Sequence, residues 1–185
     1  MKSHVLKQAL FGAIGGAAGT FVLGKVMGLG SKLQSAEDQW IERELKREPP
    51  TEALARRAAR AGLGVELSRQ EKHQLGEAVH WGYGVTWGAI YGMLRTRLPV
   101  SSKMGGLPFG VAFGFLGSGV LLPLFKLTPP ATEFPVSSHL NGLVSHYAYT
   151  ATVEGVCSGL EAIDHAVAGR RSKARLTKAE MREVA

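Results

Sequence analysis

Four ionisable side chains in the last apolar stretch of the sequence have the types and spacing that proton transfer requires. At 100° per residue, His139, His146, Glu154 and Glu161 fall within about 80° of one helical face. Histidine titrates near neutral pH, and burial raises the pKa of a glutamate toward the same range. Because ionisable groups are costly inside a lipid bilayer, we predict that this face turns inward.

The second apolar stretch, at about 78–98, carries another polar face, which includes Trp87. Its helical angles allow it to lie against the face formed by the last stretch. Together the two faces form a polar seam, made of Glu77, His80, Tyr91, His139, His146, Glu154 and Glu161. This seam is a candidate path for protons or small ions. In the alternative, structural interpretation, the histidines hydrogen-bond across helices and Glu154 either pairs with one of them or is protonated.

Other kinds of chemistry have less support in the sequence. His80, His146 and Glu154 are ligand types for zinc or iron, but no H-E-x-x-H, E-x-x-H or C-x-x-C spacing accompanies them. The single Cys157 suits helix packing, and there is no G-x-S-x-G motif or glycine-rich phosphate loop. The tryptophans and tyrosines suit core packing and interfacial belts better than a pigment or quinone pocket. We therefore expect no enzyme, no metal and no cofactor.

The elements that would position the seam are four apolar stretches, predicted to be membrane-spanning helices at about 6–29, 78–98, 104–125 and 139–162. The third has about 22 residues, which at 1.5 Å each gives roughly 33 Å, enough to cross a hydrocarbon core of about 30 Å. The predicted fold is all-α: a four-helix transmembrane bundle over residues 1–165, with a partly helical charged connector at 31–75. A basic cytoplasmic tail, 166–185, follows. A soluble bundle of buried apolar helices is the alternative.

Glycine recurs at every fourth position in two of these stretches. An interior glycine costs a soluble helix roughly 1 kcal/mol relative to alanine, and in a bilayer close helix packing offsets that cost. We predict helix-packing roles for Gly84, Gly88, Gly92, Gly106, Gly110 and Gly114.

Capping signals divide the polar segments. Ser35 is predicted to begin a helix that runs through Lys46, and Pro49-Pro50 ends it. Ser68 and Glu71 form a capping box at the start of the helix that continues through the second span. Three further caps are expected: Thr51 for a second connector helix, Ser137 or Ser138 for the fourth span, and Thr177 for a short helix in the tail.

The chain has a net charge of +7, and several of its basic residues lie beside the predicted spans, as is typical of membrane proteins. Basic residues collect on the cytoplasmic side of spans, and Arg95, Arg97, Lys103 and the tail place the loop after span two and both termini there. The basic residues of the connector favour the opposite orientation. No repeat of aromatic and basic residues indicates nucleic-acid binding, so we expect none.

Three segments resemble a known family. The pattern Ala78-Val-His80-Trp-Gly-Tyr-Gly84-Val-Thr-Trp-Gly88-Ala-Ile-Tyr-Gly92 is similar to the second span of the YagU-like family of uncharacterised bacterial inner-membrane proteins. Leu127-Thr-Pro-Pro130 with Phe134-Pro135 resembles its proline-rich loop, and His139-Leu-Asn-Gly-Leu-Val-Ser-His146 resembles the start of its last span. The resemblance covers most of residues 5–165. It implies a four-helix inner-membrane protein loosely associated with acid tolerance, with no established activity.

These observations lead to two functional hypotheses. The first is a small integral protein of the bacterial inner membrane with a structural or accessory role, whose partners are the lipid bilayer and a homo-oligomer or a larger membrane complex. The second is a minimal proton-linked transporter or channel that uses the polar seam.

Overall fold

The polar connector forms two short helices between the first and second apolar stretches. The computed structural model describes residues 2–97 and 102–183, and begins with one long helix, α1 (Lys2–Leu33). Ser35 then caps α2 (Ala36–Leu45), because its side chain accepts a hydrogen bond from the Asp38 amide, as predicted. The helix α3 (Pro50–Leu63) differs from expectation: Pro49 is its N-cap and Pro50 its first residue, so Thr51 lies inside the first turn.

The second apolar stretch lies in α4 (Arg69–Leu94), and its predicted capping box is confirmed. The Ser68 hydroxyl accepts from the Glu71 amide at 3.2 Å, and the Ser68 amide donates to the Glu71 carboxylate at 2.8 Å. A single 3₁₀ turn, η1 (Arg95–Arg97), continues α4. Leu98, the predicted end of this span, lies outside the described residues.

The third stretch is shorter and less regular than predicted. Gly105 and Gly106 have φ angles of +60° and +80°, so α6 begins only at Leu107 (Leu107–Gly114) and Gly106 precedes the helix. Gly106 therefore lies just before the helix and not, as we had predicted, within it, although a Cβ atom there would lie only 2.9 Å from the Thr150 side chain, the close approach that its predicted packing role requires. A π-helical segment, η2 (Phe115–Leu121), and one last turn, α7 (Leu122–Leu124), complete the stretch.

The fourth stretch belongs to a much longer helix. After a 3₁₀ turn, η3 (Ala131–Glu133), α8 runs without a break from Val136 to Glu183. Its 48 residues give a length of roughly 72 Å. No proline follows Val136, and residues with high helix propensity fill the end of the chain. The separate tail helix expected to start at Thr177 is therefore wrong, since α8 continues through this position.

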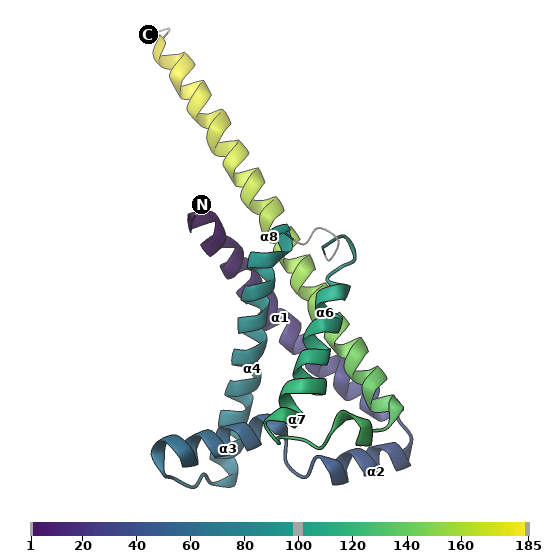
Figure 1. Ribbon diagram of the computed structural model, residues 1–185. Helices are drawn as coiled ribbons and strands as arrows, with labels where there is room; N and C mark the ends of the chain where they lie inside the picture. The colour runs from purple at the N-terminus through teal and green to yellow at the C-terminus, as the bar shows by residue number, and fades with distance from the viewer. Residues whose placement is uncertain (1, 98–101, 184–185) are drawn as a thin grey trace.

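The chain passes along the long axis of the molecule four times, through α1, α4, α6–α7 and α8 (Figure 1). The helix α1 packs against both α4 and α8, α6 packs against α8, and α3 packs against α4. The helices α2 and α3 lie at one end, whereas the start of α1, the 3₁₀ turn η1 and the extended part of α8 point toward the other end.

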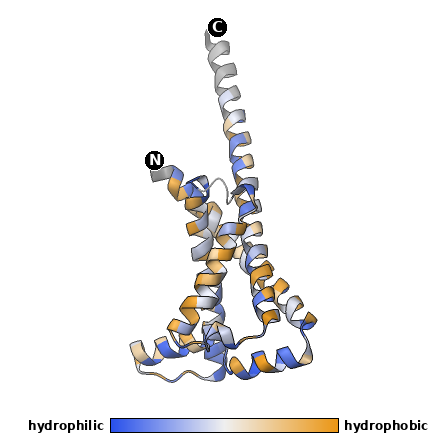
Figure 2. Cartoon of the chain, turned by 45° about the vertical axis from the view of Figure 1, so that its right-hand side comes forward, coloured by the Kyte–Doolittle hydropathy of each residue, from blue (hydrophilic) through white to orange (hydrophobic). Residues whose placement is uncertain are grey.

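Two helices are long and apolar enough to cross a membrane, over His4–Leu33 and Leu107–Leu124. Within the described residues, α4 and α8 do not meet the same criterion, so two of the four predicted spans have this support. Only 33% and 11% of an 18-residue apolar window in each stretch is buried, whereas the core helix of a soluble protein is mostly buried. Large apolar side chains are exposed on both, and Figure 2 shows apolar residues along the helices of the bundle. Examples are Leu6, Leu10, Ile14, Phe21, Phe115 and Leu124.

The buried core is small and aromatic. Tyr91, Phe113 and Tyr149 are buried with Val153 and Cys157, and further rings pack around them. The Phe113 ring lies 5.3 Å from that of Tyr149, centroid to centroid. This packing joins α4, α6 and α8 midway along the bundle.

Polar contacts hold the connector against the first turn of α8 and the segment just after α7. The hydroxyls of Ser137 and Ser138 donate to the carboxylates of Asp38 and Glu42 at 2.7 and 2.6 Å. Neither serine caps α8, which begins at Val136, so that prediction was wrong. On the other connector helix, the Arg57 guanidinium donates to two carbonyls just after α7, those of residues 125 and 126.

Several glycines occupy places where no side chain fits. A Cβ atom on Gly88 would lie closer than 3.0 Å to backbone atoms of Gly12 and Gly16. One on Gly92 would meet Gln8 and Gly12 in the same way. Other glycines face side chains: Gly84 faces Thr20, Gly110 faces Thr150, and Gly114 faces His146.

Gly88→Ala tests the close approach of α1 and α4. The added methyl group meets backbone that cannot move aside, so we expect a loss of about 1–3 kcal/mol in unfolding free energy, the usual range for overpacking. The matched control is Gly82→Ala on the same helix, where nothing lies within 4 Å. That change should be neutral or raise stability by up to about 1 kcal/mol. Denaturant unfolding in detergent measures both; equal effects of the two changes would contradict the contact.

Glu42→Gln tests how the connector is held. Burial raises the pKa of the Glu42 carboxyl, but hydrogen bonds from Lys46, Ser138 and Gln34 outweigh this and leave the pKa below its ordinary 4.5. The carboxylate therefore stabilises the connector above about pH 4.5, and this contribution is lost as the pH falls through the lowered pKa. Since α2 has no buried residue, the polar contacts hold it in place.

Hydrogen exchange of the α2 amides, corrected for intrinsic rates, gives the readout. Wild-type protection should fall as the pH drops below about 4.5, whereas Glu42→Gln should be poorly protected throughout. The exposed Glu44→Gln is the control and should follow the wild type. A wild type whose protection does not change below this pH would refute the role of Glu42.

Candidate functional site

An arginine and a glutamate form an ion pair inside the bundle, between the end of α4 and the middle of α8. Arg95 and Glu154 are only 7% and 8% exposed. The guanidinium donates to both carboxylate oxygens, from Nη2 to Oε1 at 2.5 Å and from Nε to Oε2 at 3.1 Å. This two-pronged geometry fixes the direction as well as the distance between the two helices.

Three hydroxyl groups complete the surroundings of Glu154. Tyr91, one turn before Arg95, donates at 2.7 Å to Oε2. Ser102, in the loop before α6, and Ser158, one turn along α8, donate to Oε1 at 2.7 and 2.9 Å. A carboxylate that accepts this many hydrogen bonds is held in its ionised form, because a protonated acid would lose acceptor sites.

The guanidinium also connects the pair to α1. Arg95 Nη1 lies 2.7 Å from the Glu161 carboxylate, which in turn accepts from Gln8 Nε2 at 2.7 Å. Farther out, Lys7 and Asp164 form a half-exposed ion pair at 2.6 Å. We call Gln8, Tyr91, Arg95, Ser102, Glu154, Ser158 and Glu161 the arginine–carboxylate cluster.

The cluster has a clear physical consequence. Removing two charges from water costs several kcal/mol per ion, which the attraction offsets only when the remaining polar atoms also find partners. Here each oxygen of Glu154 has partners, and the guanidinium bridges two carboxylates. Such an arrangement holds helices in one register and offers no free base or nucleophile.

The structure brings three residues of the predicted seam together: Tyr91, Glu154 and Glu161 all belong to the cluster. The expected partner of Glu154 was a histidine or a proton, whereas the structure places Arg95 there. Proton or ion conduction through these residues stays a prediction.

The other four seam residues lie apart from the cluster. His146 hydrogen-bonds to the Gly142 carbonyl of its own helix at 2.7 Å, and its ring stands edge-on to Phe113. His80 is partly exposed, and Glu77 and His139 are exposed. Buried residues of α8, among them Tyr149 and Val153, lie between His146 and Glu154.

Sequence analysis overlooked Arg95 as a site residue and assigned it only to the basic loop after span two. A signal was present, because Arg95 follows Trp87 and Tyr91 at intervals of four and continues their helical face. Two glutamates seven residues apart on the inner face of α8 also require a cation nearby. Gln8, Ser102 and Ser158 carry no comparable signal, since small and amide side chains are common in helices and loops.

The described residues do not form a candidate metal site. In residues 2–97 and 102–183, histidine, cysteine and acidic side chains do not gather in threes around a point that a metal ion could occupy. Among the rings considered for a pigment pocket, Tyr83 and Trp87 pack edge to face with their centroids 6.0 Å apart, and both also contact Phe113.

Arg95→Met tests the cluster. The change leaves the buried Glu154, and the partly exposed Glu161, without their cation, so we expect a loss of about 3–5 kcal/mol in unfolding free energy. The control Arg97→Met removes an exposed arginine two residues away and should cost less than about 0.5 kcal/mol. Denaturant unfolding in detergent measures both. Similar losses for the two variants would show that the buried pair does not stabilise the fold.

The comparisons with known proteins place most of this site in one matched segment. A family model described as "Protein of unknown function (DUF1440)" matches residues 42–155. This segment contains Arg95 and Glu154, and it includes much of the charged connector, which the YagU-like resemblance left unmatched. No curated protein and no solved structure matches the chain.

Proposed function

We propose that this chain, which belongs to the DUF1440 family of proteins of unknown function, is an integral membrane protein with a structural or accessory role. In this proposal it crosses the bacterial inner membrane four times, with both termini in the cytoplasm. The observation that carries the proposal is the inverted distribution of its side chains: large apolar residues are exposed along the helices, while the most buried charged pair lies between them.

Three features support the four crossings. The chain passes along the bundle four times, and the connector lies at the end opposite to the start of α1. The cluster pairs Arg95, just after α4, with Glu154 and Glu161 of α8, which lowers the cost of placing these three charges in a bilayer. Close glycine contacts between α1 and α4 supply the packing that helices need where no water drives association.

A structural or accessory role fits these features better than transport. Glu154 is held by Arg95 and three hydroxyls, and within the described residues no seam histidine forms a hydrogen bond with the cluster. The proton-linked transporter therefore remains the second candidate, without an observation in its favour. The link to acid tolerance rests on the family resemblance alone.

Association with a partner helix or a second copy is part of the proposal. Gly155 and Gly159 on α8, and Gly24 and Gly28 on α1, have nothing within 4 Å. In a bilayer, faces of this kind allow close approach of another helix.

Cysteine labelling tests the crossings. In a Cys157→Ala background, single cysteines replace Glu44, Lys103, Glu133 and His165, all of which are exposed. With intact cells and a membrane-impermeant maleimide, positions 44 and 133 should react, whereas 103 and 165 should react only after the membrane is opened. Reaction at 44 and 103 from the same side, or loss of the protein in a carbonate wash, would refute the proposal.

A further inference from the structure

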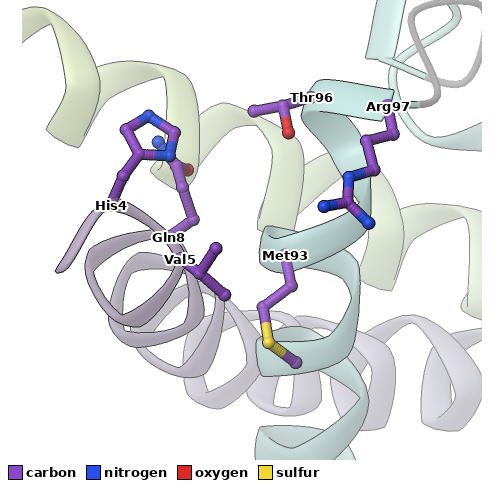
Figure 3. A pocket seen from close by; sticks show the side chains of 6 residues that line it. All are labelled: His4, Val5, Gln8, Met93, Thr96 and Arg97. Atoms are coloured by element: carbon purple, nitrogen blue, oxygen red, sulfur yellow. The ribbon is translucent and has the colours of Figure 1, made fainter. Parts of the chain in front are cut away.

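A recess lies beside the cluster, between the first turns of α1 and the last turns of α4. Its volume is about 400 Å³, and Figure 3 shows the six side chains that line it: His4, Val5, Gln8, Met93, Thr96 and Arg97. It lies at the end of the bundle where α1 begins and η1 ends.

The recess carries positive charge that the protein does not neutralise. Arg97 has no carboxylate or hydrogen-bond partner among the residues that the structure describes, and Figure 3 shows its side chain directed toward the space between the helices. His4 stands on the opposite side, on α1. The neighbouring Arg95 differs, because Glu154 and Glu161 already pair with it.

Gln8 adds a second, independent observation. Its side chain is 4% exposed, and its Nε2 donates to Glu161 at 2.7 Å, which fixes the orientation of the amide. The Oε1 atom is then a buried acceptor with no hydrogen-bond partner within the described part of the chain. An unpaired buried acceptor of this kind destabilises the fold, and a ligand that brings a hydroxyl group would satisfy it.

Apolar side chains complete the recess. Val5 and Met93 form its lower wall in Figure 3. The site therefore combines the Arg97 guanidinium and a free acceptor with an apolar wall. This is the pattern of an amphiphile with an anionic head.

We propose that the recess binds the headgroup of an anionic phospholipid of the phosphatidylglycerol type. The phosphodiester lies between His4 and Arg97, and a glycerol hydroxyl donates to Gln8, while the acyl chains leave the recess past Val5 and Met93. The inference rests on the proposed membrane location. Basic recesses between helices on the cytoplasmic side are suited to such headgroups, and each arginine contributes about 1 kcal/mol there.

The test titrates the purified full-length protein, in a nonionic detergent, with phosphatidylglycerol and follows its unfolding temperature. We expect the temperature to rise with phosphatidylglycerol but not with phosphatidylcholine, which has no hydroxyl donor. The variant Arg97→Gln should weaken the apparent affinity about fivefold, the equivalent of one lost charge. The control Lys103→Gln removes an exposed charge at the same end of the bundle and should change it less than about twofold.

Three outcomes would overturn the inference. They are equal shifts with the two lipids, wild-type affinity in Arg97→Gln, and an equal rise with inorganic phosphate, which would indicate a soluble anion. A failure of the proposed membrane location can be told apart from a failure of the lipid site, because cysteine labelling tests the location in cells without added lipid.

Discussion

The structure depends on one interaction, the ion pair between Arg95 and Glu154. Two charges withdrawn from water destabilise any fold unless every remaining polar atom finds a partner. That requirement fixes the positions of Tyr91, Ser102 and Ser158, whose hydroxyls supply the missing hydrogen bonds. It also sets the register of α4 against α8, since a rotation or a shift by one residue would leave a buried charge unpaired.

The close contact of α1 with α4 and the cluster support each other. Gly88 and Gly12 allow the two backbones to approach, and this brings Gln8 to the Glu161 carboxylate on α8. The aromatic core then fills the space that the wider α4–α8 separation leaves, with Phe113 of α6 against Tyr149. The small apolar core explains why polar contacts carry so much of the specificity in this bundle.

Local signals in the sequence predicted the helices well, because caps and prolines act over a few residues. The capping box at Ser68 and the cap at Ser35 are examples. Other features depend on tertiary structure. The pairing of Arg95 with Glu154 joins residues 59 positions apart, and it requires knowing how α4 is rotated against α8. The positive φ of Gly106 and the continuation of α8 through Thr177 have no decisive local signal either, so the predicted boundaries failed there.

The most direct test of this account is a double-mutant cycle with Arg95→Met and Glu154→Met, measured by denaturant unfolding in detergent. If the pair organises the bundle, Arg95→Met leaves the Glu154 carboxylate without its cation, and Glu154→Met leaves the Arg95 guanidinium without its most buried partner. The double variant should then be more stable than the sum of the two losses predicts, with a coupling energy of about 1–3 kcal/mol. Losses that simply add would show that the two residues do not act as a pair, and the account would be wrong.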